Sequence, residues 1–382
     1  MLCVYCAREF DNKEFSKEHV LPKALGGNIN DRNPFLLKSV CKRCNNLSGL
    51  YIDGPFIRSW IINNHRASNL HDYAHIDASP ALPLIYMGYL KHRILQTHDC
   101  EVWMAPAGNT VFHFHEPYPI EDNFWALGRP KGKKNIEIDR GFAFIMISST
   151  NPIWYPTVFN SIFDGFENTT LYIGNRHTYI TGAPRISVIP DDKLFIQDEI
   201  LELMKGHLKI NFRHYIDYDQ RFMAKFALGM GCIHLNDFIQ SEDAERLRQY
   251  MWEESPEKRA EYMLRGKPTL KEMPNAFNEL MSWPPGHTIL LMPIGKTLIV
   301  CIYLFGQMSF IMEVSRKKAQ WAGVIDSDGI AYFVSPSNQR ALGPISYAEY
   351  LAVKTDNYIN DDIITFLSKY GAKPAQPPFN IQ

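Results

Sequence analysis

Two pairs of closely spaced cysteines constrain this 382-residue chain more than any other feature of its sequence. Cys3 and Cys6 form the first CxxC pair, and Cys41 and Cys44 form the second. Two intervening residues let both thiolates of a pair turn toward one ion, and two such pairs complete the tetrahedral sulfur site that Zn²⁺ prefers. Because so short a segment has little core of its own, metal binding would supply much of its folding free energy. We therefore predict a structural zinc site, rather than two redox-active pairs, at the start of the chain.

The surroundings of the other cysteines and the chain's hydropathy favour a reducing compartment. Cys100, Cys232 and Cys301 lie in apolar or strand-like segments, as small buried side chains do. The first ten residues lack a basic stretch followed by an apolar one, and no apolar run is as long as a membrane span. We therefore expect a cytoplasmic protein with no membrane contact, in which paired cysteines are metal ligands more often than disulfides.

The segment between the cysteine pairs carries a recognisable pattern. It reads EHVLPKALGG at residues 18–27 and NPF at residues 33–35, and Asn45 follows the second pair directly. This pattern resembles the HNH endonuclease superfamily with its ββα-metal fold, in particular the branch with two CxxC knuckles and an EHxxPxxLGG…CxxCN core. The resemblance implies a strand, a loop, a second knuckle and a helix that starts near Asn45. It also implies hydrolysis of phosphodiester bonds in DNA.

The resemblance assigns roles that suit the chemistry of the residues concerned. Phosphodiester hydrolysis needs an activated water, a cation on the phosphate and help for the leaving oxygen. A neutral histidine suits the first task, and His19 matches the position of the general base. Glu18 and Asn45 match positions that would bind a catalytic Mg²⁺ or Mn²⁺, which favours oxygen ligands. The middle residue, which positions the histidine, is Asn33 or Asn28, and Asn33 fits the pattern better.

Positive charge gathers around this segment, although the net charge of the whole chain is only −1. Residues 1–70 contain ten Lys or Arg and six Asp or Glu, a net charge of +4. This positive charge is modest but could attract a polyanion, and double-stranded DNA is the expected partner. The basic side chains expected to contact phosphates are those of Lys17, Lys23, Lys42 and Arg43.

The rest of the sequence predicts a larger α+β region with antiparallel strands after the zinc-stapled module. We expect the module at 1–72, ending in an amphipathic helix over 54–72, a mainly β region at 73–195, and a mixed C-terminal domain at 196–382. Alternating apolar and polar residues predict strands at 287–294, 296–305, 309–315 and 331–336. Helices are expected at 197–209 and 219–251. This C-terminal domain could recognise substrate, a regulatory ligand or a protein partner, and oligomerisation stays open.

Two further interpretations accompany these predictions. His113 and His115 share one face of an expected strand and could bind a metal with Glu116 or His92, although strand faces often carry such histidines without a ligand. The function expected for the whole chain is a metal-dependent HNH endonuclease, with a role in antiviral defence implied by family analogy alone. The alternative is a non-catalytic zinc-binding adaptor for nucleic acid or protein.

Overall fold

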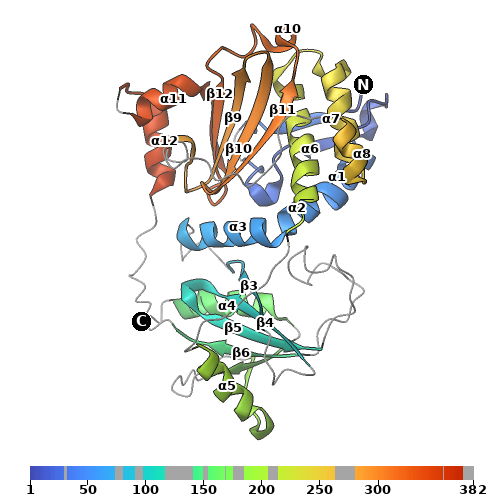
Figure 1. Ribbon diagram of the computed structural model, residues 1–382. Coiled ribbons are helices and arrows are strands. Elements are labelled where there is room, and N and C mark those ends of the chain that lie inside the picture. The colour runs from blue at the N-terminus through green and yellow to red at the C-terminus, as the bar shows by residue number, and fades with distance from the viewer. Residues whose placement is uncertain are drawn as a thin grey trace. The chain divides into compact units, whose positions relative to one another are not determined.

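Two compact units make up the structure, a computed structural model (Figure 1). It describes residues 1–29, 32–73, 81–90, 98–116, 141–148, 154–167, 169–174, 185–204, 214–262, 280–355 and 357–372. One unit combines Met1–Ile57 with Tyr215–Ala372, and the other comprises Arg58–His214. The N-terminal module thus shares a unit with distant residues, whereas the predicted boundaries at 72 and 195 stay predictions.

The N-terminal module is a hairpin followed by a helix. Strands β1 (Phe15–His19) and β2 (Leu36–Cys41) pair antiparallel, and α1 (Lys42–Ser48) follows at once. The predicted helix start near Asn45 is too late by one turn, because the Cys41 side chain accepts a hydrogen bond from the backbone N–H of Cys44 and caps the helix. The second cysteine pair therefore lies at the helix N-terminus.

A five-stranded antiparallel sheet forms the centre of the same unit. Its strand order is β11-β10-β9-β12-β13. The strands are β9 (His287–Ile294), β10 (Thr297–Leu304), β11 (Met308–Ser315), β12 (Ile330–Ser335) and β13 (Arg340–Ser346). The first four lie where the alternating pattern predicted them, whereas β13 was not predicted.

Helices and the N-terminal module cover the two faces of this sheet. Phe333 and Cys301 point to one face and pack on α11 and α12. On the other face, Phe310 contacts Phe56 and Tyr332 contacts Phe35, so the N-terminal module packs there. The helices of the unit are α2 (Gly54–Arg58), α6 (Ile216–His234), α7 (Glu242–Trp252), α8 (Pro256–Glu261), α10 (Lys318–Trp321), α11 (Tyr347–Lys354) and α12 (Asp361–Gly371). Its short 3₁₀ or π turns are Asn12–Glu14, Lys23–Leu25, Gly49–Asp53 and Phe238–Gln240.

A six-stranded sheet forms the centre of the second unit, in the order β3-β4-β5-β6-β7-β8. Its strands are β3 (Ile85–Leu90), β4 (Asp99–Met104), β5 (Thr110–His115), β6 (Phe142–Met146), β7 (Thr170–Ile173) and β8 (Ile186–Ser187). Neighbours from β3 to β6 are antiparallel, but β6, β7 and β8 run parallel. The parallel step arises because a helix absent from the prediction, α4, connects β6 to β7.

The helices of the second unit cover both faces of its sheet. Aliphatic and aromatic side chains of α4 pack on one face, and Ile200 of α5 packs on the other. The helices are α3 (Trp60–Tyr73), α4 (Tyr155–Gly165) and α5 (Leu194–Met204), and the 3₁₀ turns are Pro106–Gly108 and Asp191–Lys193. The predicted α+β class with antiparallel strands is confirmed. None of the described helices is both long and apolar enough to cross a membrane.

Candidate active site and metal centre

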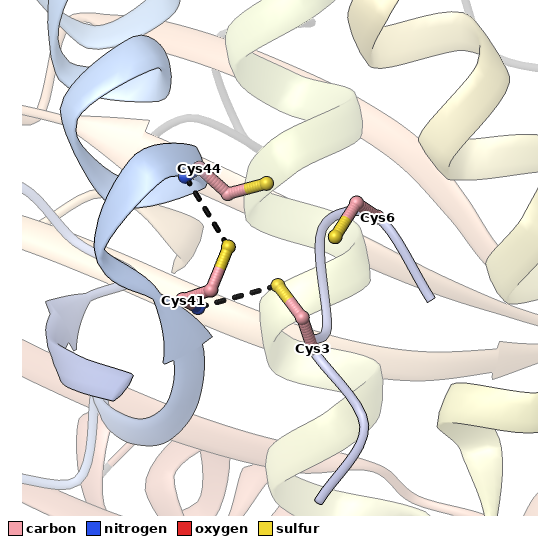
Figure 2. Close-up of side chains that lie close together, drawn as sticks. All are labelled: Cys3, Cys6, Cys41 and Cys44. Atoms are coloured by element: carbon pink, nitrogen blue, oxygen red, sulfur yellow. Dashed lines mark hydrogen bonds between the residues drawn. The ribbon is translucent and has the colours of Figure 1, made fainter. Parts of the chain in front are cut away.

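The four cysteines of the N-terminal module converge on one point. Their Sγ atoms all lie within 4.8 Å of one another. Figure 2 shows the four side chains lying close together. The backbone N–H of Cys41 donates to Cys3 Sγ at 3.3 Å, and that of Cys44 donates to Cys41 Sγ at 3.5 Å. Backbone donors that stabilise negative sulfur are what a thiolate metal site requires. The predicted cluster is therefore present, and it could bind zinc.

The electrostatics of the cluster favour deprotonated sulfur at Cys3. A hydrogen bond from the Cys44 side chain, helped by backbone N–H groups and opposed by burial, lowers the pKa of the Cys3 thiol to about 5. The thiolate is the form of cysteine that binds metal. A set of four sulfur donors, three of them on buried residues, suits a closed structural Zn²⁺ site rather than an open catalytic one.

The imidazole of His19, at the end of β1, has a defined orientation. Its Nδ1 lies 2.8 Å from the backbone carbonyl oxygen of Gly27. A carbonyl can only accept, so Nδ1 carries the hydrogen and the lone pair of a neutral His19 resides on Nε2. The ring is half-buried, so its orientation is held without loss of solvent access. This is the tautomer that a general base needs.

The loop between β1 and β2 presents the Gly27 carbonyl to His19. A 3₁₀ turn over Lys23–Leu25 ends at Gly26, whose φ of +83° suits glycine. At Gly27, a Cβ would lie 1.6 Å from the carbonyl oxygen of Leu21, so no other residue fits without moving the backbone. The two glycines of the LGG pattern therefore allow the loop to come close enough for the Gly27 carbonyl to contact His19.

The structure separates the two candidates for the middle asparagine. The Nδ2 of Asn33 donates to Gly27 O at 2.6 Å, and its Oδ1 accepts from Phe35 N at 2.9 Å. Asn33 Nδ2 also lies 3.4 Å from His19 Nδ1. Among the described hydrogen bonds, none joins Asn28 to His19 or to the Gly27 carbonyl. Asn33 thus braces the same carbonyl that orients His19.

Asn45 connects α1 to β1. Its Nδ2 donates to Ser16 Oγ and to the carbonyl of Lys17, both at 3.0 Å. These bonds use the nitrogen, and no described hydrogen bond uses Oδ1. The side chain is therefore anchored two to three residues before His19 with an oxygen available for another ligand.

Comparison with known proteins agrees with this geometry. Residues 3–61 match the family model of the HNH endonucleases. This segment is therefore similar to the HNH endonucleases, and we call residues 3–61 the HNH module. The family is metal-dependent and acts on nucleic acid, which supports a nuclease role for this segment. No curated protein and no solved structure matches the chain.

The side chain of Glu18 does not lie on the same face of β1 as that of His19. Neighbouring residues of a strand point to opposite faces, and Glu18 turns into the interior, where it is 3% exposed. There it accepts a hydrogen bond from Tyr5 at 2.9 Å and forms an ion pair with Lys225 at 2.7 Å. Both partners contact Oε1 and lie in the interior, and the expected role of Glu18 as a ligand of a catalytic ion stays a prediction.

Lys225 and Asp53 are residues of this site that the sequence interpretation missed. The Lys225 ammonium is fully buried and lies 2.8 Å from Asp53 Oδ2, and it also donates to the His19 carbonyl at 3.3 Å. Burial raises the pKa of Asp53 to about 6 even though Lys225 acts to lower it. Burial disfavours the charge of Lys225, but Asp53 and Glu18 outweigh it and leave the pKa of Lys225 raised. A lysine within the apolar run RFMAKFALGMG was the available signal.

The basic residues predicted to contact phosphate are accessible. The side chains of Lys17, Lys23, Lys42 and Arg43 are all exposed. Lys17 lies on the hairpin, Lys23 on the loop that carries Gly27, and Lys42 and Arg43 on the first turn of α1. Contact with phosphate stays a prediction for each of them.

Proposed function

We propose that the HNH module is a metal-dependent DNA endonuclease in which His19 is the general base. The supporting observation is the hydrogen bond from His19 Nδ1 to the Gly27 carbonyl. It leaves Nε2 as the basic atom and prevents the ring from rotating. Nε2 would take a proton from a water molecule as the water oxygen bonds to phosphorus and the bond to the 3′ oxygen breaks.

Asn33 is a positioning residue in this proposal. Its amide shares the Gly27 carbonyl with His19, and its Oδ1 is held by the N–H of Phe35 at the entry to β2. Both strands of the hairpin therefore contribute to the position of one imidazole. Orientation of this kind matters because a displacement of about 1 Å can lower a rate by about 10²-fold.

The residues present fit a hard divalent ion held largely by water and substrate. We assign Asn45 Oδ1 as its protein ligand, since this is an oxygen donor on a side chain already anchored to β1. Mg²⁺ and Mn²⁺ prefer oxygen and need few protein ligands. When bound, such an ion supplies positive charge to the phosphate and to the leaving oxygen. Glu18 has no part in this assignment.

DNA is the proposed substrate because the resemblance to HNH endonucleases implies it, and the exposed Lys17, Lys23, Lys42 and Arg43 are available to its phosphates. Phosphate contacts of this kind position a duplex without reading its sequence. A role in antiviral defence, a regulatory ligand or protein partner for the C-terminal residues, and oligomerisation stay predictions from the sequence.

The decisive experiment compares plasmid cleavage by the wild type, His19→Ala and a control, His98→Ala, with Mg²⁺ and with Mn²⁺. His98 lies just before β4, in the other unit. We expect His19→Ala to cut about 10²–10⁴-fold more slowly, the usual contribution of a general base, and His98→Ala to match the wild type. Cleavage that survives His19→Ala would overturn the assigned role.

A substrate panel tests the choice of DNA. It includes double-stranded, single-stranded, branched and modified DNA, and RNA. We expect double-stranded DNA to be cut. Cleavage of RNA alone would contradict the proposed substrate, and the absence of cleavage by the wild type with every metal and substrate would favour a non-catalytic adaptor.

A further inference from the structure

A second group of metal-ligating side chains lies in the other unit, outside the HNH module. Glu101 on β4 and His113 on β5 are directly opposite each other in the antiparallel register. His115 follows two residues later on the same face of β5. One ligand atom from each of the three side chains lies within 4.8 Å of those from the other two. This adds Glu101 to the histidine pair noted in the sequence, whereas Glu116 is exposed and His92 lies outside the described residues.

The three side chains are buried in an otherwise apolar layer. Glu101, His113 and His115 are 1%, 5% and 4% exposed. The ring of Phe166, which follows α4, lies 5.1 Å from that of His113. At Gly141, a Cβ would clash with the Phe114 carbonyl and would also lie 3.1 Å from His113 Nε2. A carboxylate placed so deeply is costly unless a cation compensates it, and buried charges in proteins are paired or coordinate metals.

Hydrogen bonding leaves two buried atoms of the group, Glu101 Oε1 and His113 Nε2, without a partner among the described residues. Glu101 Oε2 accepts from Trp103 Nε1 at 2.8 Å, whereas Oε1 is buried with no hydrogen-bond partner among the described residues. His115 Nδ1 lies 2.7 Å from the Glu116 carbonyl, so it carries the hydrogen and the Nε2 of a neutral ring carries a lone pair. That Nε2 lies 3.8 Å from Glu101 Oε1, which is too long for a direct hydrogen bond. His113 Nδ1 forms a hydrogen bond of 3.4 Å with Oε2, whereas its buried Nε2 has no described hydrogen-bond partner.

We propose that Glu101, His113 and His115 bind a divalent first-row transition metal ion. Ligands at ~2.1 Å from a tetrahedral ion stand roughly 3.4 Å apart, so the observed spacings of 3.4 and 3.8 Å suit an ion after small side-chain shifts. Two imidazoles and one carboxylate are donors found around Zn²⁺ and Fe²⁺, whereas Mg²⁺ and Ca²⁺ prefer oxygen alone. The ion would hold β4 and β5 together beneath Phe166.

The test measures metal bound per full-length chain by elemental analysis. Protein is produced in medium supplemented with zinc or with iron. We expect two transition-metal equivalents in the wild type, one of them zinc at the four cysteines. In Glu101→Gln, which keeps the shape and can still accept from Trp103, we expect about one. His98→Asn, whose wild-type ring lies beside Phe142 on the same sheet, should keep both.

The same elemental analysis shows whether the second ion is Zn²⁺ or Fe²⁺. One equivalent in the wild type under both supplements, or two equivalents in Glu101→Gln, would overturn the proposal. Should Glu101→Gln fail to fold, loading of the wild type with Co²⁺ decides, because thiolate and nitrogen–oxygen sites give different absorption. Two spectroscopically distinct sites are expected, and thiolate-bound Co²⁺ alone would contradict the assignment. None of these readouts depends on nuclease activity.

Discussion

Lys225 of α6 and Glu18 of β1 form a buried ion pair with an Nζ–Oε1 distance of 2.7 Å. The same ammonium binds Asp53, in the turn after α1, and the carbonyl of His19. One cation from the C-terminal part of the chain therefore compensates two carboxylates of the HNH module. It also contacts the backbone of the proposed general base, so it connects the packing of α6 to the position of His19.

Replacement of Lys225 by methionine should strongly destabilise the unit that contains the HNH module. Removing one partner of a buried ion pair leaves uncompensated charge and costs about 3–5 kcal/mol. Here two carboxylates, Glu18 and Asp53, would lose their cation. Denaturant unfolding of the variant measures this change. The exposed Lys318→Met is the matched control and should unfold like the wild type.

The loss of folding stability in Lys225→Met should also depend on pH. In the wild type the pKa of Asp53 is already raised to about 6, above its unfolded value of about 4. The folded state thus binds the extra proton between these values, and the contribution of Asp53 to stability falls as pH rises through them. Without Lys225 the folded pKa rises further, so the variant should lose more stability relative to the wild type at pH 8 than at pH 5. An equal loss at both pH values would contradict this account.

Asn33 should matter for catalysis more than Asn28 does. Asn33→Ala removes the amide that braces the Gly27 carbonyl, so the His19 ring loses part of its orientation. We expect kcat to fall by about 10²-fold with a small change in KM, because misplacement acts on the reacting geometry. Asn28→Ala is the matched control and should retain activity. The assignment of Asn33 fails if the two variants have the same kcat.

Asn45→Ala should raise the Mg²⁺ concentration needed for half-maximal cleavage. The variant loses the proposed ligand oxygen together with the bonds from Nδ2 to Ser16 and Lys17. The neighbouring Asn46 is exposed, so Asn46→Ala provides the control. A metal titration separates the two roles, since a purely structural loss would lower the maximal rate without shifting the midpoint. An unchanged midpoint in Asn45→Ala would exclude it as a ligand.

Cys41→Ser should release the zinc of the cysteine cluster and unfold the HNH module. Cys41 provides a proposed ligand and also caps α1 through its sulfur. Because metal binding supplies folding free energy to so small a module, we expect loss of one zinc equivalent and a lower Tm. Cys232→Ser, outside the cluster, should retain that zinc. Zinc retained in full by Cys41→Ser would contradict the assignment.

The sequence by itself located the cysteine cluster and the HNH pattern, because both are local. Two CxxC pairs, the LGG turn and the residues beside them fall within about fifty residues, and their spacing alone brings four sulfurs together. The same short-range pattern predicted His19 as the general base, whereas its hydrogen bond to the Gly27 carbonyl is known only from the structure. Asn33 and Asn28 could not be separated in this way, because both lie in the loop and only the fold shows which amide reaches the Gly27 carbonyl.

Tertiary structure alone decided where Glu18 points and what compensates it. Glu18 and Lys225 are 207 residues apart, and no local periodicity records a partner at that separation. Glu101 is likewise brought to His113 by strand pairing, which sequence spacing does not specify. Charges can be buried only when the complete fold supplies their counter-ions. The sequence therefore shows an acidic residue beside His19, but it does not show the buried cation that compensates this residue in the interior.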